Sequence, residues 1–310
     1  MTSYPLTPSQ IEELFYSEAA CVDYICALRW PEGLRCEKCQ NIIFWRDATI
    51  FTCKSCRHHV WVMAGTIFQN TKIPLTKWFR AMWEVVRRKK GANALTLSSE
   101  LKVKYDTAWN LLQKVRRAMV FPGSTRLSGL VEIDETLFGG FSEGQPGQTK
   151  NAKVRIIGAI ELKKEKETLK TGRMRLQIID SANAESLLGF VHENVEKGSR
   201  IITDEWREYS QLKDFGHDHH VDANKRKEDT LPHAHLVFSL FKRWILATHQ
   251  GAVSREHLMY YLDEFVFCYN RRTSKNRGLL FHHLLENAVR LSPVTREEIN
   301  THSSQYHGKK

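Results

Sequence analysis

Two short β-branched runs that end on aspartates constrain the fold of this 310-residue chain more than any other feature. They cover residues 131–134 (VEID) and 201–204 (IITD). Because side chains alternate across a strand, Val131 and Ile133 would point into a core while Asp134 faces the other way. In the second run, Asp204 follows directly after the apolar residues, where a buried strand would reach the surface. Strands that deliver two carboxylates to one edge of a sheet can hold a divalent cation there.

The order of the predicted elements indicates a mixed sheet. Strand-like runs lie at residues 130–138, 154–162, 174–180, 201–203 and, more weakly, 217–221. Helical patterns lie at residues 184–195, 232–249, 254–270 and 278–290. Three successive strands with no helix between them cannot be doubly wound, so we expect an antiparallel meander extended by parallel strands, with helices on both faces. This is an RNase H-like core, in which the first and fourth strands each carry an acid and a late helix brings a third ligand.

Asp134 and Asp204 are therefore the candidate metal ligands. Two Mg²⁺ ions about 3.5–4 Å apart can supply a nucleophilic oxygen at neutral pH and clamp a phosphate. Since Mg²⁺ prefers hard oxygen ligands, we expect Asp134 to bridge the pair and Asp204 to ligate one ion. Glu132 points to the same face as Asp134 and would support it, whereas Glu135 and Glu205 are expected to be solvated or structural.

The third ligand is expected on the helix that begins at Pro232. His235 and Lys242 are seven residues apart and share one face of this helix. His235 would ligate the second metal, and Lys242 would contact DNA phosphate. Histidine is a softer ligand than Mg²⁺ prefers, but it is acceptable to Mn²⁺. Alternatively, His235 only forms hydrogen bonds with DNA or a neighbouring side chain. The other candidates for the third ligand are His233, Glu228, Asp229 and the pair Asp263 and Glu264.

Four of the seven cysteines form two C-x-x-C pairs, and the polar N-terminus lacks a signal-peptide core. In a reducing cytosol such pairs indicate metal binding rather than disulfides. A strand-like run, a polar turn and a second short strand separate the two pairs, which is the pattern of a four-cysteine zinc ribbon. The predicted zinc ligands are Cys36, Cys39, Cys53 and Cys56.

A helical region follows the cysteines. An apolar stripe between residues 75 and 86 predicts one amphipathic helix. A short helix at 98–103, a turn, and a longer helix at 107–120 then resemble a helix-turn-helix, although an ordinary helical hairpin has the same pattern. The longer helix carries Lys114, Arg116 and Arg117, which makes them candidates for DNA contact.

The charge balance favours a polyanionic partner. Lysines and arginines number 46 against 35 acidic residues, a formal net charge of +11 at pH 7. This excess is typical of proteins that bind nucleic acid. No apolar run is long enough to span a bilayer, so we expect no membrane association.

The whole chain resembles transposases of bacterial insertion sequences, in the branch that joins a zinc ribbon, a helix-turn-helix and an RNase H-like, DDE-type domain. The resemblance is carried by residues 36–56, 131–140 (VEIDETLFGG), 203–209 (TDEWREY), 238–243 (FSLFKR) and 261–272 (YLDEFVFCYNRR). By position, Asp134 and Asp204 match the first two catalytic acids of the family. Many relatives carry Glu or Asn where this chain has His235, ahead of a Lys or Arg that matches Lys242.

The resemblance implies cleavage of double-stranded DNA at element ends, which leaves a 3′-hydroxyl that attacks target DNA, with Mg²⁺ or Mn²⁺ for catalysis and Zn²⁺ for structure. It also implies a homo-oligomer assembled on paired ends, in the cytoplasm and on the nucleoid. The alternatives are a domesticated DNA-binding protein without catalysis and a plain metal-dependent nuclease. The candidate DNA-contacting residues are Lys114, Arg116, Arg117, Lys242, Arg243, Arg271 and Arg272.

The predicted fold class is α/β with several domains. Residues 1–66 would form N-terminal helices and the zinc ribbon, and residues 67–122 the helix-turn-helix region. Residues 128–290 would form the RNase H-like catalytic domain, followed by a loosely ordered tail at 291–310.

Overall fold

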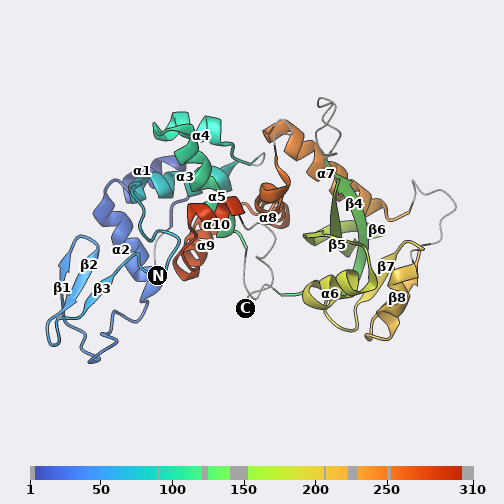
Figure 1. Cartoon of the computed structure of the whole chain (residues 1–310), viewed down its shortest axis with the longest axis horizontal. Coiled ribbons are helices and arrows are strands. Elements are labelled where there is room, and N and C mark those ends of the chain that lie inside the picture. Colours follow the sequence, from blue (N-terminus) through green and yellow to red (C-terminus); the bar gives the residue numbers. More distant parts are fainter. Residues whose placement is uncertain are drawn as a thin grey trace. The chain divides into compact units, whose positions relative to one another are not determined.

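The computed structural model describes residues 4–88, 91–120, 125–139, 153–205, 207–222, 230–249 and 253–301. The chain divides into two compact units (Figure 1). Met1–Phe121 and Thr273–Lys310 form the first, called the N-terminal unit below, and Pro122–Arg272 form the second, called the sheet unit. In the described part of the chain, no helix combines the length and the apolar character needed to cross a membrane.

The N-terminal unit begins with two helices and a small sheet. Helix α1 (Pro8–Leu14) is capped by Thr7 and helix α2 (Glu18–Arg29) by Ser17. In each case the hydroxyl oxygen of the cap accepts a hydrogen bond from a backbone N–H of the first turn. Strands β1 (Phe44–Asp47), β2 (Ile50–Cys53) and β3 (His59–Trp61) then pair antiparallel in the order β1-β2-β3. The hairpin expected between the two cysteine pairs is therefore β1–β2.

Five further helices complete the N-terminal unit: α3 (Leu75–Arg87), α4 (Ala94–Leu101), α5 (Tyr105–Arg117), α9 (Arg277–Arg290) and α10 (Arg296–Thr301). The apolar stripe of α3 is buried as predicted. Phe281 of α9 contacts the rings of Phe15, Phe79 and Trp83, so α9 packs with the N-terminal helices. The sequence division ends the catalytic region at residue 290, whereas α9 belongs to the first unit.

The two helices of the suggested helix-turn-helix are displaced from their predicted bounds. Helix α4 starts four residues earlier than the predicted residue 98, because the Asn93 side chain caps it by accepting from the Thr96 backbone N–H at 2.8 Å. It ends at Leu101 because Lys102 adopts a left-handed conformation. Helix α5 therefore begins at Tyr105, within the residues expected to form the turn.

The sheet unit contains a mixed five-stranded sheet, as predicted. Strands β4 (Leu130–Phe138), β5 (Val154–Glu165) and β6 (Thr168–Ile179) form an antiparallel meander. Strands β7 (Arg200–Thr203) and β8 (Asp218–Val221) extend it in parallel on the β4 side, in the order β6-β5-β4-β7-β8. Pairing of β4 with β7 aligns Glu132 with Ile202.

Helices cover both faces of this sheet (Figure 1). On one face, α6 (Ala184–Asn194) and the 3₁₀ helix η1 (Arg207–Lys213) enclose a core that includes Val131 and Ile133. On the other face, α7 (Pro232–His249) and α8 (Leu258–Asn270), which follows the short turn η3 (Arg255–His257), pack on the even-numbered residues of β5. The alternation of strand side chains thus separates two cores, and Asp134 faces the α7 side.

A glycine allows α7 to lie close to Asp134. Gly158 of β5 is paired directly with Asp134 of β4. A Cβ atom at this position would lie 2.8 Å from Phe238 Cε1 of α7 and 2.8 Å from Leu176 Cδ2 of β6. Both distances are shorter than a carbon–carbon contact, so any side chain here would push α7 or β6 outwards.

We expect Gly158→Ala to lower the free energy of unfolding by about 1–3 kcal/mol, because the added methyl overpacks the core beneath α7. Gly189→Ala is the matched control, since Gly189 lies within α6 with no atom within 4 Å of the added Cβ. That control should be neutral or stabilising by up to about 1 kcal/mol. Urea denaturation followed by tryptophan fluorescence measures both, and equal stabilities of the two variants would contradict this packing.

Candidate active site and zinc centre

The four predicted zinc ligands come together in the N-terminal unit. Cys36, Cys39, Cys53 and Cys56 have sulfur atoms that all lie within 4.8 Å of one another. The sulfur of Cys36 lies 3.5 Å from that of Cys56, and the sulfur of Cys39 lies 3.5 Å from that of Cys53. Tetrahedral zinc with Zn–S bonds near 2.3 Å separates its ligands by about 3.8 Å, so this cluster fits the ion.

Hydrogen bonds prepare the Cys53 thiol for metal binding. Burial raises the pKa of this thiol, but backbone hydrogen bonds at Cys56 and Ser55 and the Asn41 amide outweigh it and lower the pKa to about 6. The Asn41 side-chain nitrogen lies 3.6 Å from the Cys53 sulfur. Since zinc binds thiolates, these donors favour the form that ligates.

In the sheet unit, three successive side chains on one face of β4 contact α7. Glu132 accepts a hydrogen bond from the Ala234 backbone N–H at 2.8 Å and one from His233 Nδ1 at 2.7 Å. Asp134 Oδ2 lies 3.2 Å from His235 Nε2. Thr136 Oγ1 accepts from Lys242 Nζ at 2.7 Å. Since strand residues two apart share a face, β4 fixes both the start and the middle of α7 through this one row of side chains.

The pairing of β4 and β7 brings Asp204 beside Asp134. Glu132 is paired with Ile202; Asp134 follows two residues later within β4, and Asp204 comes directly after the last residue of β7. Neighbouring strands lie about 4.8 Å apart, and Asp204 is close enough for its charge to act on the carboxyl in the middle of β4. Burial raises the pKa of Asp134 to about 6, and the negative charges of Asp204 and Glu132 act in the same direction. The carboxyl of Asp134 is thus held where a cation would relieve unfavourable charge.

His235 of α7 contacts Asp134 directly. Its Nε2 lies 3.2 Å from Asp134 Oδ2, the distance of a hydrogen bond or ion pair, which is the alternative role expected for this histidine. The same contact places an imidazole nitrogen and a carboxylate oxygen where both could reach one metal ion. His235 is 45% exposed and Asp134 12%, so the pair is open to solvent on the helix side. In the described residues, however, only the four cysteines bring three or more potential ligand atoms within 4.8 Å of one another.

The other candidates for the third ligand differ from His235 in their surroundings. His233 donates to Glu132, and its second ring nitrogen lies 3.3 Å from the Leu169 carbonyl. Glu264 is fully buried in α8. Glu228 and Asp229 lie outside the described residues. His235 is therefore the described candidate that contacts Asp134 directly.

One candidate DNA contact is a structural residue. Arg116 is only 1% exposed and donates to the Gln113 side chain and to the Ala92 carbonyl at 3.1 Å. Its guanidinium therefore holds α5 against the residues before α4 and is not accessible to DNA. Sequence periodicity missed this because Arg116 falls between the apolar positions of α5, next to Val115.

The remaining cationic candidates are more accessible, although several are partly engaged. Burial lowers the pKa of Lys114 and Lys242, and that of Arg271 to about 10. Arg271 lies over the Phe267 ring at 4.2 Å. Arg272 is exposed, stacks on Tyr269 at 4.0 Å and donates to carbonyls of the β6 start. Arg243 is exposed on α7, and Arg117 is partly exposed on α5.

Known proteins resemble the chain in both units. Residues 126–270 match the model of the ISXO2-like transposase domain, and residues 16–59 match the transposase zinc-ribbon domain. The chain is 25% identical, over 274 residues, to an uncharacterized protein in transposable element ISH50 of Halobacterium salinarum, a match that covers 81% of this chain and 90% of that protein. The chain belongs to the insertion-sequence transposases.

A solved structure, the simian T-cell lymphotropic virus intasome in complex with PP2A regulatory subunit B56 gamma, is also similar to the transposase. Its matching chain is 11% identical, with a TM-score of 0.33 over 62% of this chain and 71% of that chain. A score this low supports no argument about the fold or the activity.

The structure adds a pair of residues that sequence reasoning did not assign to the site. Tyr209 of η1 is buried and donates its hydroxyl to Glu135 Oε1, and the Glu135 backbone N–H donates to Asp134 Oδ1 at 2.8 Å. Burial raises the pKa of Glu135 to about 7. Glu135 is thus structural, one of the two roles expected for it. An aromatic residue five positions after Asp204 is the only sequence signal for Tyr209.

Behind Asp204, a second chain of hydrogen bonds holds the end of β7. His219 of β8 bonds Thr203 Oγ1 at 2.9 Å, and Thr203 Oγ1 donates to the Asp204 carbonyl at 2.9 Å. Both His219 and Thr203 are buried. Side chains from neighbouring elements, Tyr209 of η1 and His219 of β8, therefore hold the residues next to the two aspartates of the transposase.

Tyr209→Phe removes the hydroxyl that donates to the half-buried Glu135 carboxyl. We expect the free energy of unfolding to fall by about 1–3 kcal/mol, because this acceptor loses a partner that comes from the core. Chemical denaturation of Tyr209→Phe, Glu135→Gln and the double variant forms a cycle that isolates the pair. A coupling energy of zero in this cycle would show that the bond contributes nothing.

Proposed function

We propose that this transposase cleaves double-stranded DNA at the ends of its element and joins the released 3′-hydroxyl to target DNA. The observation that carries the proposal is the row of contacts between β4 and α7, with Asp204 directly after the end of the adjacent strand β7. Asp134 and Asp204 would be the catalytic acids, and His235 the third metal ligand. Bound Mg²⁺ or Mn²⁺ would supply the activated oxygen nucleophile and the clamp on the scissile phosphate.

The residues around these ligands would act by holding and orienting. Glu132, through the Ala234 backbone N–H and His233, fixes the first turn of α7 and with it His235. Lys242 donates to Thr136 and interacts favourably with Asp134, so its ammonium would neutralise a DNA phosphate brought to the metal. The raised pKa of Asp134 means that metal binding must compete with a proton below about pH 6.

DNA would be held by both units. Helices α4 and α5 would act as a helix-turn-helix, with Lys114 and Arg117 as phosphate contacts on α5. Lys242, Arg243, Arg271 and Arg272 would contact DNA near the catalytic acids. A homo-oligomer would assemble on paired ends in the cytoplasm, on the nucleoid. The functional division would be a ribbon at residues 1–66, a DNA-binding region at 67–122 and a catalytic region from 128, with α9 packing on the DNA-binding side.

Incubation of the protein with element-end duplex, a target plasmid and Mg²⁺ or Mn²⁺ tests the activity. Joined products support the transposase. Cutting without joining would identify a metal-dependent nuclease instead. Binding without cutting would identify a DNA-binding protein that has lost catalysis. Both aspartates at the sheet edge favour the first outcome.

Asp134→Asn should abolish cleavage and joining while the affinity for element-end DNA stays within a few fold. The same variant should stabilise the metal-free protein by about 1–3 kcal/mol at pH 7.5. Because the pKa of Asp134 is raised to about 6 in the fold, its ionised form disfavours folding above that pH, and the gain should vanish as the pH falls towards 4.

Urea denaturation across this pH range measures the effect. Asp214→Asn, an exposed acid in the same unit, changes the charge equally and is the control. A loss of both stability and DNA affinity in Asp134→Asn would instead assign the residue a folding role.

His235→Ala should slow cleavage roughly 10- to 100-fold, the usual loss for weakened metal ligation, and shift the preference between Mn²⁺ and Mg²⁺. Titration of each metal against the cleavage rate measures this shift. His233→Ala serves as the comparison, because His233 bonds Glu132 rather than Asp134. Wild-type rates for His235→Ala with both metals would rule out His235 as a ligand.

A further inference from the structure

The sheet of the zinc ribbon has one face that carries exposed aromatic side chains. Strand pairing aligns Trp45 with Thr52 and His59, and aligns Asp47 with Ile50 and Trp61. Directly paired residues and residues two apart share a face, so Trp45 and Trp61 lie on the same one, which we call the tryptophan face. On the opposite face, Phe51 contacts Phe44 and Trp30.

Large apolar groups on the tryptophan face and at its edge are open to solvent. Trp45 is 43% exposed and Trp61 54%, and Ile42 and Ile43 just before β1 are exposed as well. So small a metal-stabilised unit has little hydrophobic core of its own. Two tryptophans that stay exposed to water remove a large amount of apolar surface from the area that this unit could bury. Clustered exposure of this kind marks an interaction surface.

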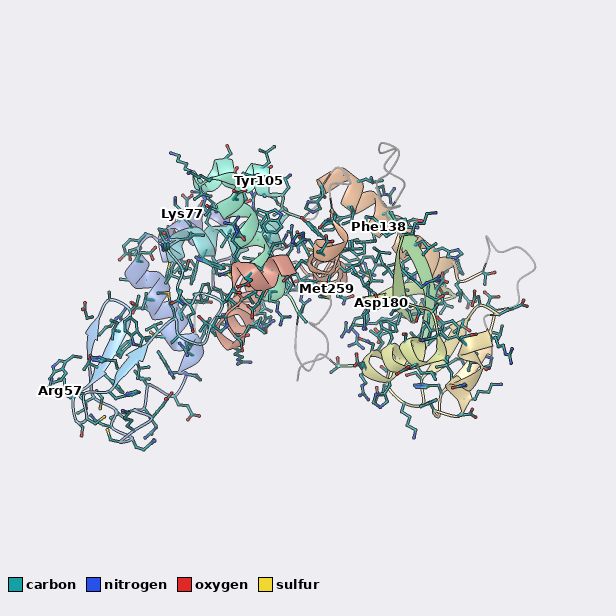
Figure 2. The ribbon with its side chains drawn as sticks, viewed as in Figure 1. Arg57, Lys77, Tyr105, Phe138, Asp180 and Met259 are labelled. Carbon is teal, nitrogen blue, oxygen red and sulfur yellow. The ribbon has the colours of Figure 1, made fainter. Side chains whose placement is uncertain are left out.

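Cations from the second cysteine knuckle lie over one of these rings. The Arg57 guanidinium is 4.3 Å from the Trp45 ring centroid, and the Lys54 ammonium is 5.6 Å from it. Both side chains are exposed, and Arg57 lies at the outer edge of the ribbon (Figure 2). The Lys54 backbone donates to the Ile43 carbonyl at 3.0 Å, so the knuckle and the tryptophan face form one structure that depends on the metal.

We propose that the tryptophan face binds unpaired nucleotides of DNA, with Trp45 and Trp61 stacking on bases and Arg57 and Lys54 pairing with phosphates. An apolar protein partner would have to desolvate both cations without pairing them, whereas a phosphate backbone neutralises them. A strand presents successive base faces to two tryptophans only where it is unpaired, because stacking covers the base faces inside a duplex. The proposal rests on the DNA-binding part of the proposed function and adds a strand-opened substrate to it.

The spacing of the two tryptophans suggests how a strand would lie. They are two strands apart and offset by two residues, which places their Cα atoms about 12 Å apart. The two rings would therefore stack on different bases of one strand instead of enclosing a single base. Between them lies the Thr52–His59 pair, with Thr52 Oγ1 2.9 Å from His59 Nδ1.

The test uses the zinc-loaded full chain and two fluorescent probes, an oligothymidylate of about 20 nucleotides and a blunt duplex of similar length. Trp45→Ala and Trp61→Ala should each weaken oligothymidylate binding roughly 5- to 100-fold and leave duplex binding nearly unchanged. Tyr16→Ala, which truncates an aromatic side chain that is 78% exposed outside the ribbon, is the matched control and should bind both probes like the wild type. Zinc content, measured for every variant, should stay at one ion per chain, which excludes loss of the ribbon fold.

Equal affinity of the tryptophan variants and Tyr16→Ala for oligothymidylate would overturn the proposal. A change in oligomeric state with unchanged oligothymidylate binding would also overturn it and assign the face to contact between protein copies. If the wild type binds the duplex but not oligothymidylate, the tryptophan face is rejected while the proposed function survives. If the wild type binds neither probe and also fails to bind element-end DNA, the tryptophan-face proposal and the proposed function are both rejected.

Discussion

The parallel pairing of β4 with β7 is the constraint on which the candidate active site depends. Their paired residues are 70 positions apart in the chain, yet the register aligns Glu132 with Ile202, so that Asp134 follows this pair within β4 and Asp204 follows it directly after the end of β7. The meander of β4, β5 and β6 supplies the other neighbour of β4, where Gly158 leaves room for Phe238 of α7. Backbone pairing thus positions Asp134, and packing of α7 on β4 positions His235 beside it.

The partly buried carboxyls of Asp134 and Glu135 destabilise the fold when they are ionised, but they favour the binding of a cation. Burial raises the pKa of Asp134 to about 6 and that of Glu135 to about 7, so both carboxyls sit where an ionised group is destabilised. Glu135 is compensated by the Tyr209 hydroxyl. Asp134 has the His235 ring and the Lys242 ammonium nearby, but a divalent ion would satisfy it far better. A carboxyl whose ionised form is destabilised in this way is typical of functional sites.

The zinc ribbon must be stabilised in another way, because its chain segment is too short to form a hydrophobic core of its own. Four sulfur ligands at tetrahedral spacing take the place of that core. A zinc ion held by these ligands would stabilise the sheet without burial of both of its faces, so aromatic side chains could remain exposed. Stability and recognition in the N-terminal unit are thus supplied by different residues of the same hairpin.

The sequence by itself determined the features that are written in contiguous residues: the strands and their mixed order, the four zinc ligands and the helix that begins at Pro232. These follow from side-chain alternation, ligand spacing and helix-starting residues, all of which act over a few positions. Only the tertiary structure decided that Arg116 is buried, that Glu132 holds the start of α7, that α9 packs with the N-terminal helices and that Tyr209 satisfies Glu135. Each of these depends on what a polar or aromatic group meets when distant segments pack, and in several cases the partners are 70 to 100 residues apart. The pattern of a few neighbouring residues predicts whether a segment forms a helix or a strand. The groups that surround a buried charge come from distant segments and are known only once the unit has packed.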